Sequence, residues 1–214
     1  MNKFRIYWLA YALSAALLLS LSAAVLLEQV FPLDTAILQA VHQLSNRPLD
    51  YVMLVVTRTV NPHFTVPVVF VVFSILWLKR YRLEAYVFAL NCLGGVVLSN
   101  GLKVFFGKAR PAFWESSVIE TTYSYPSGHA LGSVVLYGFL AYLVGARWPQ
   151  HRVWGYGSAI ALCLAIGFSR LYLGVHWPTD LIGGYLIGLL WTSSCLFLLK
   201  HLLKQKRLRK SEAS

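Results

Sequence analysis

Three short polar motifs interrupt an otherwise apolar chain, and their residue types could bind and cleave a phosphate ester. They are K-x6-RP at residues 103–111, PSGH at 126–129 and SR-x5-H-x3-D at 169–180. Together they contribute three cationic side chains, two imidazoles and one carboxylate. Each motif lies at or near the end of a predicted membrane span, where charged side chains are costly and mark functional sites. We therefore predict that the three motifs form one active site.

The cations of the first and third motifs are suited to holding a phosphate group. Lys103 lies at the predicted end of one span, Arg110 follows it in a loop, and Arg170 lies near the end of another span. The planar guanidinium of Arg matches phosphate oxygens, whereas Lys supplies a compact point charge. Three such cations would balance a phosphate dianion and the further charge that develops during phosphoryl transfer.

The second motif immediately precedes an apolar run, so it is predicted to begin a helix. The free N–H groups and the positive dipole end of a helix N-terminus favour anion binding. Ser127 can cap this helix and donate its hydroxyl, and Gly128 lets the backbone approach a ligand closely. His129 falls in the first turn, where it could protonate the oxygen of a leaving group as a general acid.

The third motif places His176 and Asp180 four residues apart. If the turn is helical, the carboxylate can accept a hydrogen bond from one ring nitrogen of the imidazole. That bond fixes the tautomer and leaves the other nitrogen free to attack. A histidine nucleophile would form a phosphohistidine intermediate that water later hydrolyses.

The motifs do not supply the ligands of a metal-dependent phosphatase. A two-metal site needs several carboxylate or histidine ligands at one place. Asp180 is the only acid in the three motifs, and Glu115 and Glu120 in the same loop lack a ligand-like spacing. A phosphate-binding P-loop sequence is also missing. We predict no cofactor and no metal.

The elements that position the motifs are predicted to be membrane-spanning helices. The chain of 214 residues is 57% hydrophobic, and apolar runs of about 20 residues cross a bilayer as helices. We predict an all-α, integral membrane six-helix bundle that forms one domain over residues 1–214. Gly184 and Gly188 have the spacing of a close helix-packing motif. The predicted spans are approximately 6–27, 64–78, 83–102, 129–146, 153–172 and 180–199.

Residues 31–63 are too polar to span a membrane and are predicted to form interfacial helices between spans one and two. Asp34 is a plausible helix N-cap, and apolar residues follow it at helical spacing. A second start at Arg47 precedes the short apolar run 51–56. Such helices lie at a membrane surface, where they either guide a lipid to the site or only pack over the bundle.

The distribution of basic residues predicts the orientation, because short cytoplasmic segments accumulate Lys and Arg. With the N-terminus inside, 13 of the 19 Lys and Arg residues fall on the cytoplasmic side, including those of a basic tail at 200–214. We predict a multi-pass protein of the plasma membrane, as in a bacterial inner membrane, with both termini cytoplasmic and the motifs on the outer face. The net charge of +11 reflects these flanks, so nucleic acid is not predicted as a partner.

In order and spacing, the three motifs resemble the signature of the type-2 phosphatidic acid phosphatase superfamily. Every signature position is filled between residues 103 and 180. The resemblance implies a metal-independent membrane phosphatase in which His176 is the nucleophile, Asp180 is its partner and His129 is the acid. It assigns phosphate binding to five residues: Lys103, Arg110, Ser127, Gly128 and Arg170.

We predict hydrolysis of a lipid phosphate or pyrophosphate of the undecaprenyl pyrophosphate, phosphatidate or phosphatidylglycerol phosphate class. Transfer to a second lipid or sugar is an alternative, because a phosphohistidine serves either acceptor. A non-catalytic lipid-phosphate transporter would need the cations but not the pair of His176 and Asp180. Vanadium-dependent haloperoxidases share the signature but are soluble. The predicted partners are the lipid substrate and the bilayer, and no sequence pattern specifies headgroup, tail or oligomeric state.

Overall fold

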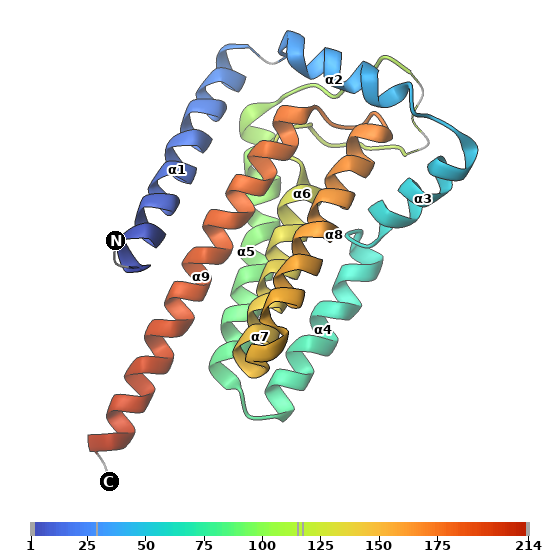
Figure 1. The fold of residues 1–214 in the computed structure, drawn as a ribbon. Coiled ribbons are helices and arrows are strands. Elements are labelled where there is room, and N and C mark those ends of the chain that lie inside the picture. The colour runs from blue at the N-terminus through green and yellow to red at the C-terminus, as the bar shows by residue number, and fades with distance from the viewer. Residues whose placement is uncertain (1–2, 29, 115, 117, 213–214) are drawn as a thin grey trace.

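The computed structural model describes residues 3–28, 30–114, 116 and 118–212, and among these it contains helices and no β-strand. Most helices lie side by side in an elongated bundle, α2 lies across one end of it, and α3 leads from that end along the side of the bundle to α4 (Figure 1). The elements in chain order are α1 (Lys3–Leu27), α2 (Pro32–His42), α3 (Arg47–Arg58), α4 (Pro62–Leu78), α5 (Arg82–Phe106), α6 (Gly128–Ser133), η1 (Val134–Gly138), α7 (Phe139–Arg147), η2 (Pro149–His151), α8 (Arg152–Tyr172) and α9 (Pro178–Glu212).

Within the part of the chain that the structure describes, five helical segments are long and apolar enough to cross a membrane, namely Arg5–Leu27, Arg82–Phe106, Gly128–Arg147, Pro149–Tyr172 and Pro178–Arg209. Helix α4, which contains the predicted span 64–78, has only 17 residues. It meets the same criterion only together with α3, from which it is bent by 41°. Residues 47–58, predicted as an interfacial helix, therefore form one arm of a bent pair that can count as a sixth span. The predicted all-α membrane bundle is confirmed.

Helix α5 ends where the first motif begins. Gly107 follows it with a left-handed φ of 57°, a conformation that costs glycine little. Its N–H donates to the carbonyl of Lys103 over 3.0 Å. The turn releases the chain into the loop that carries Arg110, so the helix end positions both cations of the motif.

The predicted span 129–146 is not one regular helix, because a single π-helical turn, η1, separates α6 from α7. Buried Asn91 of α5 donates its side-chain N–H to the carbonyl of Val135 in this turn over 2.8 Å. A polar partner of this kind offsets the cost of a backbone group that leaves regular helical bonding. The segment still runs through the bundle between α5 and α8.

Helices α6 and α9 pack closely at the glycines that the sequence singled out. A Cβ atom on Gly184 would lie 2.6 Å from the carbonyl oxygen of Ser127, and one on Gly188 would lie 2.9 Å from that of Leu131. Only glycine allows this approach without a shift of backbone. The N–H of Ser127 also donates to the carbonyl of Asp180 over 3.0 Å. The predicted close packing is confirmed, and it joins the second and third motifs.

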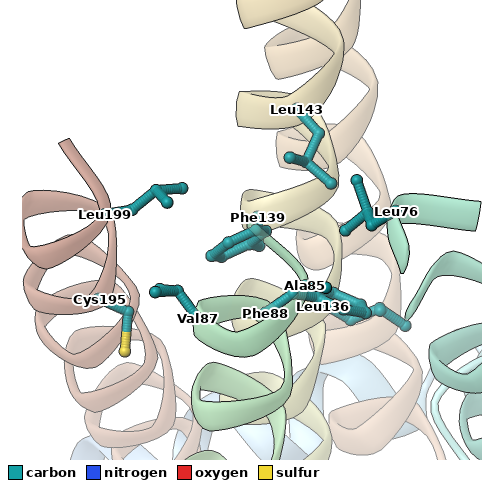
Figure 2. Close-up of a cluster of buried hydrophobic side chains, with 9 residues drawn as sticks. All are labelled: Leu76, Ala85, Val87, Phe88, Leu136, Phe139, Leu143, Cys195 and Leu199. Carbon is teal, nitrogen blue, oxygen red and sulfur yellow. The ribbon is translucent and has the colours of Figure 1, made fainter. Parts of the chain in front are cut away.

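A cluster of buried apolar side chains fills the bundle away from α2 (Figure 2). Because lipid tails are as apolar as these side chains, close van der Waals packing between the helices is what stabilises such a core in a membrane. The aromatic rings of Phe88 and Phe139 meet at 5.3 Å between centroids. The cluster draws on α4, α5, η1, α7 and α9, and its members are Leu76, Ala85, Val87, Phe88, Leu136, Phe139, Leu143, Cys195 and Leu199.

Asp34 does not cap α2, contrary to the prediction. The helix begins at Pro32, with Phe31 in the N-cap position, because proline is preorganised for the first helical turn. Asp34 lies in that first turn, is 2% exposed and contacts α9. Its carboxylate accepts the backbone N–H of Thr179 at 2.9 Å and the hydroxyl of the same residue at 2.6 Å. The carboxylate thus satisfies a free N–H at the start of α9.

Helix α9 continues to Glu212, well beyond the predicted span 180–199. Most of the basic tail predicted at 200–214 is therefore helical. Its first residues extend the apolar helix, and Leu202 and Leu203 pack against the core cluster. The helix stays intact because Lys, Arg, Gln and Leu all favour helical backbone.

Candidate active site

The structure brings the three motifs together at the end of the bundle that α2 covers (Figure 1). The first motif spans the C-terminal end of α5 and the loop 107–127. The second begins α6, and the third joins the end of α8 to the start of α9. These four helix ends meet because α6 and α9 share close glycine contacts and α8 packs beside α6.

Arg110 links the first motif to the third. Its Nη1 atom donates to the carbonyl of Val175 over 2.7 Å and lies 3.2 Å from Nε2 of His176. Its Nε atom donates to the carbonyl of Thr122 over 2.7 Å. Two backbone carbonyls therefore fix the guanidinium beside the imidazole.

Lys103 lies beside Arg110 against the same loop. Its ammonium donates to the hydroxyl of Thr122 over 3.0 Å and to the carbonyl of Tyr123 over 2.7 Å. The side chain is 7% exposed. A Cβ atom on Gly128 would lie 3.7 Å from Cε of Lys103, so the second motif adjoins this lysine. The predicted closeness of Lys103, Arg110 and Gly128 is observed.

Ser127 caps α6 as predicted, because its hydroxyl oxygen accepts the N–H of Ala130. His129 follows in the first turn, and its Nε2 atom forms a hydrogen bond of 2.8 Å with Oδ1 of Asn61. The N–H of Ser127, two residues before His129, donates to the backbone carbonyl of Asp180, whose carboxylate lies 3.3 Å from Nδ1 of His176. The two imidazoles of the motifs therefore belong to one site.

His176 and Asp180 form a buried pair. Their exposed fractions are 1% and 0%, and Nδ1 of His176 lies 3.3 Å from Oδ2 of Asp180. Because a guanidinium has only donors, the contact from Arg110 requires Nε2 to accept. The neutral ring therefore carries its proton on Nδ1, which donates to Asp180. Nε2 keeps the lone pair that a nucleophile needs.

Electrostatics favour the neutral form of this ring. Burial lowers the pKa of His176 well below 6.5, and the cationic side chains of Arg110, Arg170 and Lys103 lower it further. A neutral imidazole is the nucleophilic form. The surroundings of His176 therefore suit attack on phosphorus at neutral pH.

The carboxylate of Asp180 has several further partners. Oδ2 accepts the N–H of Trp177 at 2.9 Å and the hydroxyl of Ser124 at 2.5 Å. Oδ1 forms an ion pair of 2.9 Å with the ammonium of Lys108. These contacts come from the third motif itself and from both ends of the loop 107–127, so they fix the carboxylate from several sides.

Arg170 is fully buried at the end of α8. Its Nη1 atom donates to the hydroxyl of Thr57 over 2.7 Å, and its Nη2 atom pairs with Glu120. The second carboxylate oxygen of Glu120 lies 3.4 Å from Nη2 of Arg110. Glu120, 21% exposed on its side chain, thus bridges the two arginines. Glu115, the other acid of the loop, lies outside the described residues.

An apolar cleft of about 540 Å³ opens beside the site. Helices α4, α5 and α6 line it with side chains that include Val69, Phe70, Val96 and Leu131. Ser99 and Gly128 also line it, and their close contact lies next to Lys103. The cleft therefore joins an apolar surface to the cationic end of the site.

Sequence reasoning did not identify four residues that contact the predicted site, namely Asn61, Lys108, Glu120 and Ser124. Lys108 carried a usable signal, because it lies within the first motif and is a charged residue between two spans. Asn61 precedes a proline, which signals a helix start but not a contact with His129. Ser169, a signature position, donates to the carbonyl of Ile166 within α8 over 2.6 Å and shows no contact with another motif.

The charge around the imidazoles is supplied by the three predicted cations. Among the described residues, no three His, Cys, Asp or Glu side chains are grouped so as to hold a metal ion. The three cysteines, Cys92, Cys163 and Cys195, are free thiols.

The protein is a helical membrane bundle in which cations and two histidines gather where four helix ends meet. These features are those of a membrane-integral phosphatase. The family model of the PAP2 superfamily matches residues 84–202, more than half of the chain, and the chain belongs to this superfamily. The predicted resemblance is thereby confirmed. Members of this kind are lipid phosphatases, which hydrolyse phosphoric monoesters, and the protein is therefore an enzyme.

Two relatives support the assignment. Phosphatidylglycerophosphatase B of Bacillus subtilis (strain 168) is 30% identical over 175 residues, which cover 80% of this chain and 86% of that protein. The crystal structure of the first transmembrane PAP2-type phosphatidylglycerolphosphate phosphatase from Bacillus subtilis superposes with a TM-score of 0.81 at 28% identity. That match covers 91% of this chain and 96% of the other.

The crystal structure of Aquifex aeolicus LpxE shares the fold more distantly. Its TM-score is 0.63 at 22% identity, over 78% of this chain and 96% of that chain. The likeness adds support for the helical bundle alone.

Proposed function

We propose that the protein hydrolyses a lipid phosphate monoester at the outer membrane face, without a metal ion and through a phosphohistidine intermediate. Phosphatidylglycerol phosphate is the leading substrate, because the similar curated protein and the similar solved structure, both from Bacillus subtilis, are named for it. The observation that carries the proposal is the buried imidazole of His176. Asp180 holds its Nδ1 atom, and its Nε2 atom faces the guanidinium of Arg110.

The reaction proceeds in two transfers. In the first, Nε2 of His176 attacks phosphorus, the bond from phosphorus to the lipid oxygen breaks, and His129 gives a proton to that oxygen. In the second, water attacks the phosphohistidine, the P–N bond breaks, and the proton lost by water returns to His129. The products are the dephosphorylated lipid and inorganic phosphate. The negative charge of the bound phosphate favours the protonated form of His129.

Metal independence follows from the charges available. Lys103, Arg110 and Arg170 together provide three positive charges, which match a phosphate dianion and the charge that develops in the transition state. Gly128 and the capped N-terminus of α6 add backbone N–H groups. In this assignment Ser127 contributes its hydroxyl to the same anion site, because its N–H is already bonded to the carbonyl of Asp180.

The apolar cleft supports a lipid as the substrate. Its walls are almost entirely aliphatic and aromatic side chains of α4 and α5, and its lining includes Gly128. An acyl chain in this cleft would place its phosphate at the cations while the tail stays in an apolar surrounding. Undecaprenyl pyrophosphate and phosphatidate fit the same description and are the competing substrates.

The outer-face location is supported by the positions of basic residues. The turns between α4 and α5 and between α7 and α8 carry Lys79, Arg80 and Arg147, and they lie at the end of the bundle away from α2 (Figure 1). Positive residues favour the cytoplasmic side, so the opposite end, with the motifs, faces outward. In this proposal both termini are cytoplasmic and residues 1–214 act as one phosphatase domain.

The test is phosphate release by the purified protein in detergent with a chelator present. Phosphatidylglycerol phosphate, phosphatidate and undecaprenyl pyrophosphate are compared as substrates, and acid-labile ³²P on the protein is measured after rapid quenching. His176→Ala is expected to abolish release and labelling, whereas His151→Ala, at an exposed histidine, keeps both. Loss of wild-type activity in chelator would contradict the metal-free reaction. Transfer of the phosphate to an added alcohol without hydrolysis would favour the phosphotransferase.

A further inference from the structure

Lys108 is a buried lysine that the phosphate-binding set does not include. It is 0% exposed, and its ammonium lies 5.9 Å from the ring centroids of both Tyr125 and Trp177. A buried ammonium is costly unless anionic and polar partners surround it. Its partners therefore indicate what it does.

Those partners belong to the start of α9 and to α2. The ammonium lies 2.9 Å from Oδ1 of Asp180, donates to the hydroxyl of Thr179 over 2.8 Å and lies 3.7 Å from Oδ2 of Asp34. The hydroxyl of Thr179 in turn donates to Asp34 over 2.6 Å. The lysine, the hydroxyl and the Asp34 carboxylate thus form a closed triangle next to Asp180.

The two oxygens of Asp180 have separate partners. Oδ2 accepts hydrogen bonds from the N–H of Trp177, the hydroxyl of Ser124 and Nδ1 of His176. Oδ1 faces Lys108. A carboxylate held through one oxygen can rotate about its bond to Cβ, whereas contacts on both oxygens fix its plane. The plane of this carboxylate sets the direction in which the imidazole of His176 points.

Lys108 differs from Lys103 in its access to substrate. Cε of Lys103 lies next to Gly128, which lines the cleft, whereas the ammonium of Lys108 is enclosed by two aromatic rings, a hydroxyl and two carboxylates. An ammonium has three donors, and each of those of Lys108 has an oxygen to face. A direct contact with the phosphate is therefore not its role.

We propose that Lys108, held by Asp34 through Thr179, is a positioning residue that fixes Asp180 and thereby orients His176. The proposal rests on the assignment of His176 as nucleophile. Asp34 lies in α2 and Asp180 lies in α9. The proposal therefore also requires α2 to be packed against α9 for the nucleophile to be aligned.

Loss of alignment should slow the chemical step and leave binding intact. A misplacement of a reacting group by about 1 Å can cost roughly 100-fold in rate. Lys108→Met should therefore lower kcat and the rate of phosphohistidine formation by about 10- to 100-fold, with KM within about threefold of wild type.

Two variants of Thr179 form a closely matched pair that disturbs the fold less than Lys108→Met. Thr179→Val keeps the shape but removes the hydroxyl that joins Lys108 to Asp34, and it should lower kcat by about 3- to 30-fold. Thr179→Ser keeps the hydroxyl and should retain kcat near wild type. This pair decides the proposal if Lys108→Met does not fold.

Leu143→Ala serves as the structural control, because Leu143 is a buried apolar residue of α7 in the core cluster away from α2. It should lower the melting temperature in detergent but not the kcat of the folded protein. If Leu143→Ala lowers kcat as much as Thr179→Val at equal loss of stability, the positioning role is wrong. If both Thr179→Val and folded Lys108→Met keep wild-type kcat, it is also wrong.

These outcomes can be separated from a failure of the proposed function. An inactive wild type, or full activity in His176→Ala, would overturn the function itself. An active wild type with an essential His176 and an unaffected Thr179→Val would overturn only the role of Lys108.

Discussion

Asp180 and Glu120 are both ion-paired acids of the active site, but their surroundings differ. Asp180 is completely buried, and backbone, hydroxyl, imidazole and ammonium groups all contact it. Glu120 keeps 21% of its side chain exposed and pairs with the guanidinium groups of Arg110 and Arg170. The first carboxylate is tied to the fold, whereas the second is tied only to side chains that bind anions.

This difference indicates which acid can move when a phosphate arrives. Removal of Asp180 from its place would leave Lys108 as an unpaired buried charge, which is strongly unfavourable. Displacement of Glu120 by a phosphate exchanges one anion for another on the same arginines, and the freed carboxylate reaches water. On the proposed mechanism, the site therefore combines a permanent carboxylate that orients the nucleophile with an exchangeable one that neutralises the arginines.

The largest expected effect is on the permanent carboxylate. Asp180→Asn keeps the size of the side chain but can present an N–H to His176 and favour the wrong tautomer, so kcat should fall by about 10³- to 10⁴-fold. Steady-state phosphate release measures this loss. Asp50→Asn, at a carboxylate that accepts the hydroxyl of Tyr172 outside the motifs, is the control and should stay near wild type. A loss of less than about tenfold for Asp180→Asn would mean that the two acids do not differ as argued.

The arginines should show a smaller effect. Arg110→Lys or Arg170→Lys retains the charge but removes the planar fork, so kcat/KM should fall by about 10- to 100-fold. Initial rates over a range of lipid concentrations in mixed micelles give this ratio. Arg47→Lys, at an exposed position that begins α3, should not change it. Wild-type kcat/KM in both arginine variants would remove these residues from phosphate binding.

The exchangeable carboxylate should show an effect of opposite sign. Glu120→Gln removes an anion that competes with phosphate, so inorganic phosphate should inhibit with a Ki about 3- to 10-fold lower than in wild type. Competition against a fixed lipid substrate measures the Ki, with Glu28→Gln as the control at an exposed glutamate. An unchanged or higher Ki would show that Glu120 holds the arginines in place instead of competing for them.

The smallest effect concerns the pH dependence of stability. The folded-state pKa of His176 lies below that of an unfolded histidine, which is about 6.5. The unfolded chain therefore binds this proton first, and stability is present above pH 6.5 and is lost as pH falls below it. Between pH 7.5 and 6.0 the loss should be about 0.8 kcal/mol, or about 2 °C in melting temperature.

Thermal unfolding in detergent at the two pH values tests this, and His176→Gln should remove the same increment. His151→Gln, at an exposed position, should not. An identical pH slope in His176→Gln would show that the histidine does not fold in its neutral form.

Much of the fold and the signature part of the site could be predicted from sequence, because both depend on local patterns. Apolar runs identify the spans, and Gly184 and Gly188 indicate the close packing of α6 and α9. The motif spacing identifies His176 and Asp180, and Ser127 was expected to cap α6. Each of these signals lies within a single short segment.

The remaining contacts could not be predicted, because their partners come from distant segments. Asn61 meets His129 only because α4 begins beside α6. Asp34 looked like a helix cap but instead satisfies α9, since Pro32 moved the helix start and burial turned the side chain inward. Glu120 gives no sequence signal, because its contacts with both arginines depend on the path of the loop 107–127.

Helices α6 and α9 are in direct contact through the backbone hydrogen bond from Ser127 to Asp180 and through the glycines of α9. This contact joins His129, the proposed general acid, to His176, the proposed nucleophile. Helix α4, which forms a wall of the cleft, contacts this pair of helices at its N-cap residue Asn61, which is hydrogen-bonded to His129. We therefore expect lipid tails of different bulk to be accommodated by the part of α4 beyond Asn61, while the N-terminal end of α4 and the two imidazoles keep their places. Tolerance toward the tail and exactness toward the phosphate then reside in different helices of the same small bundle.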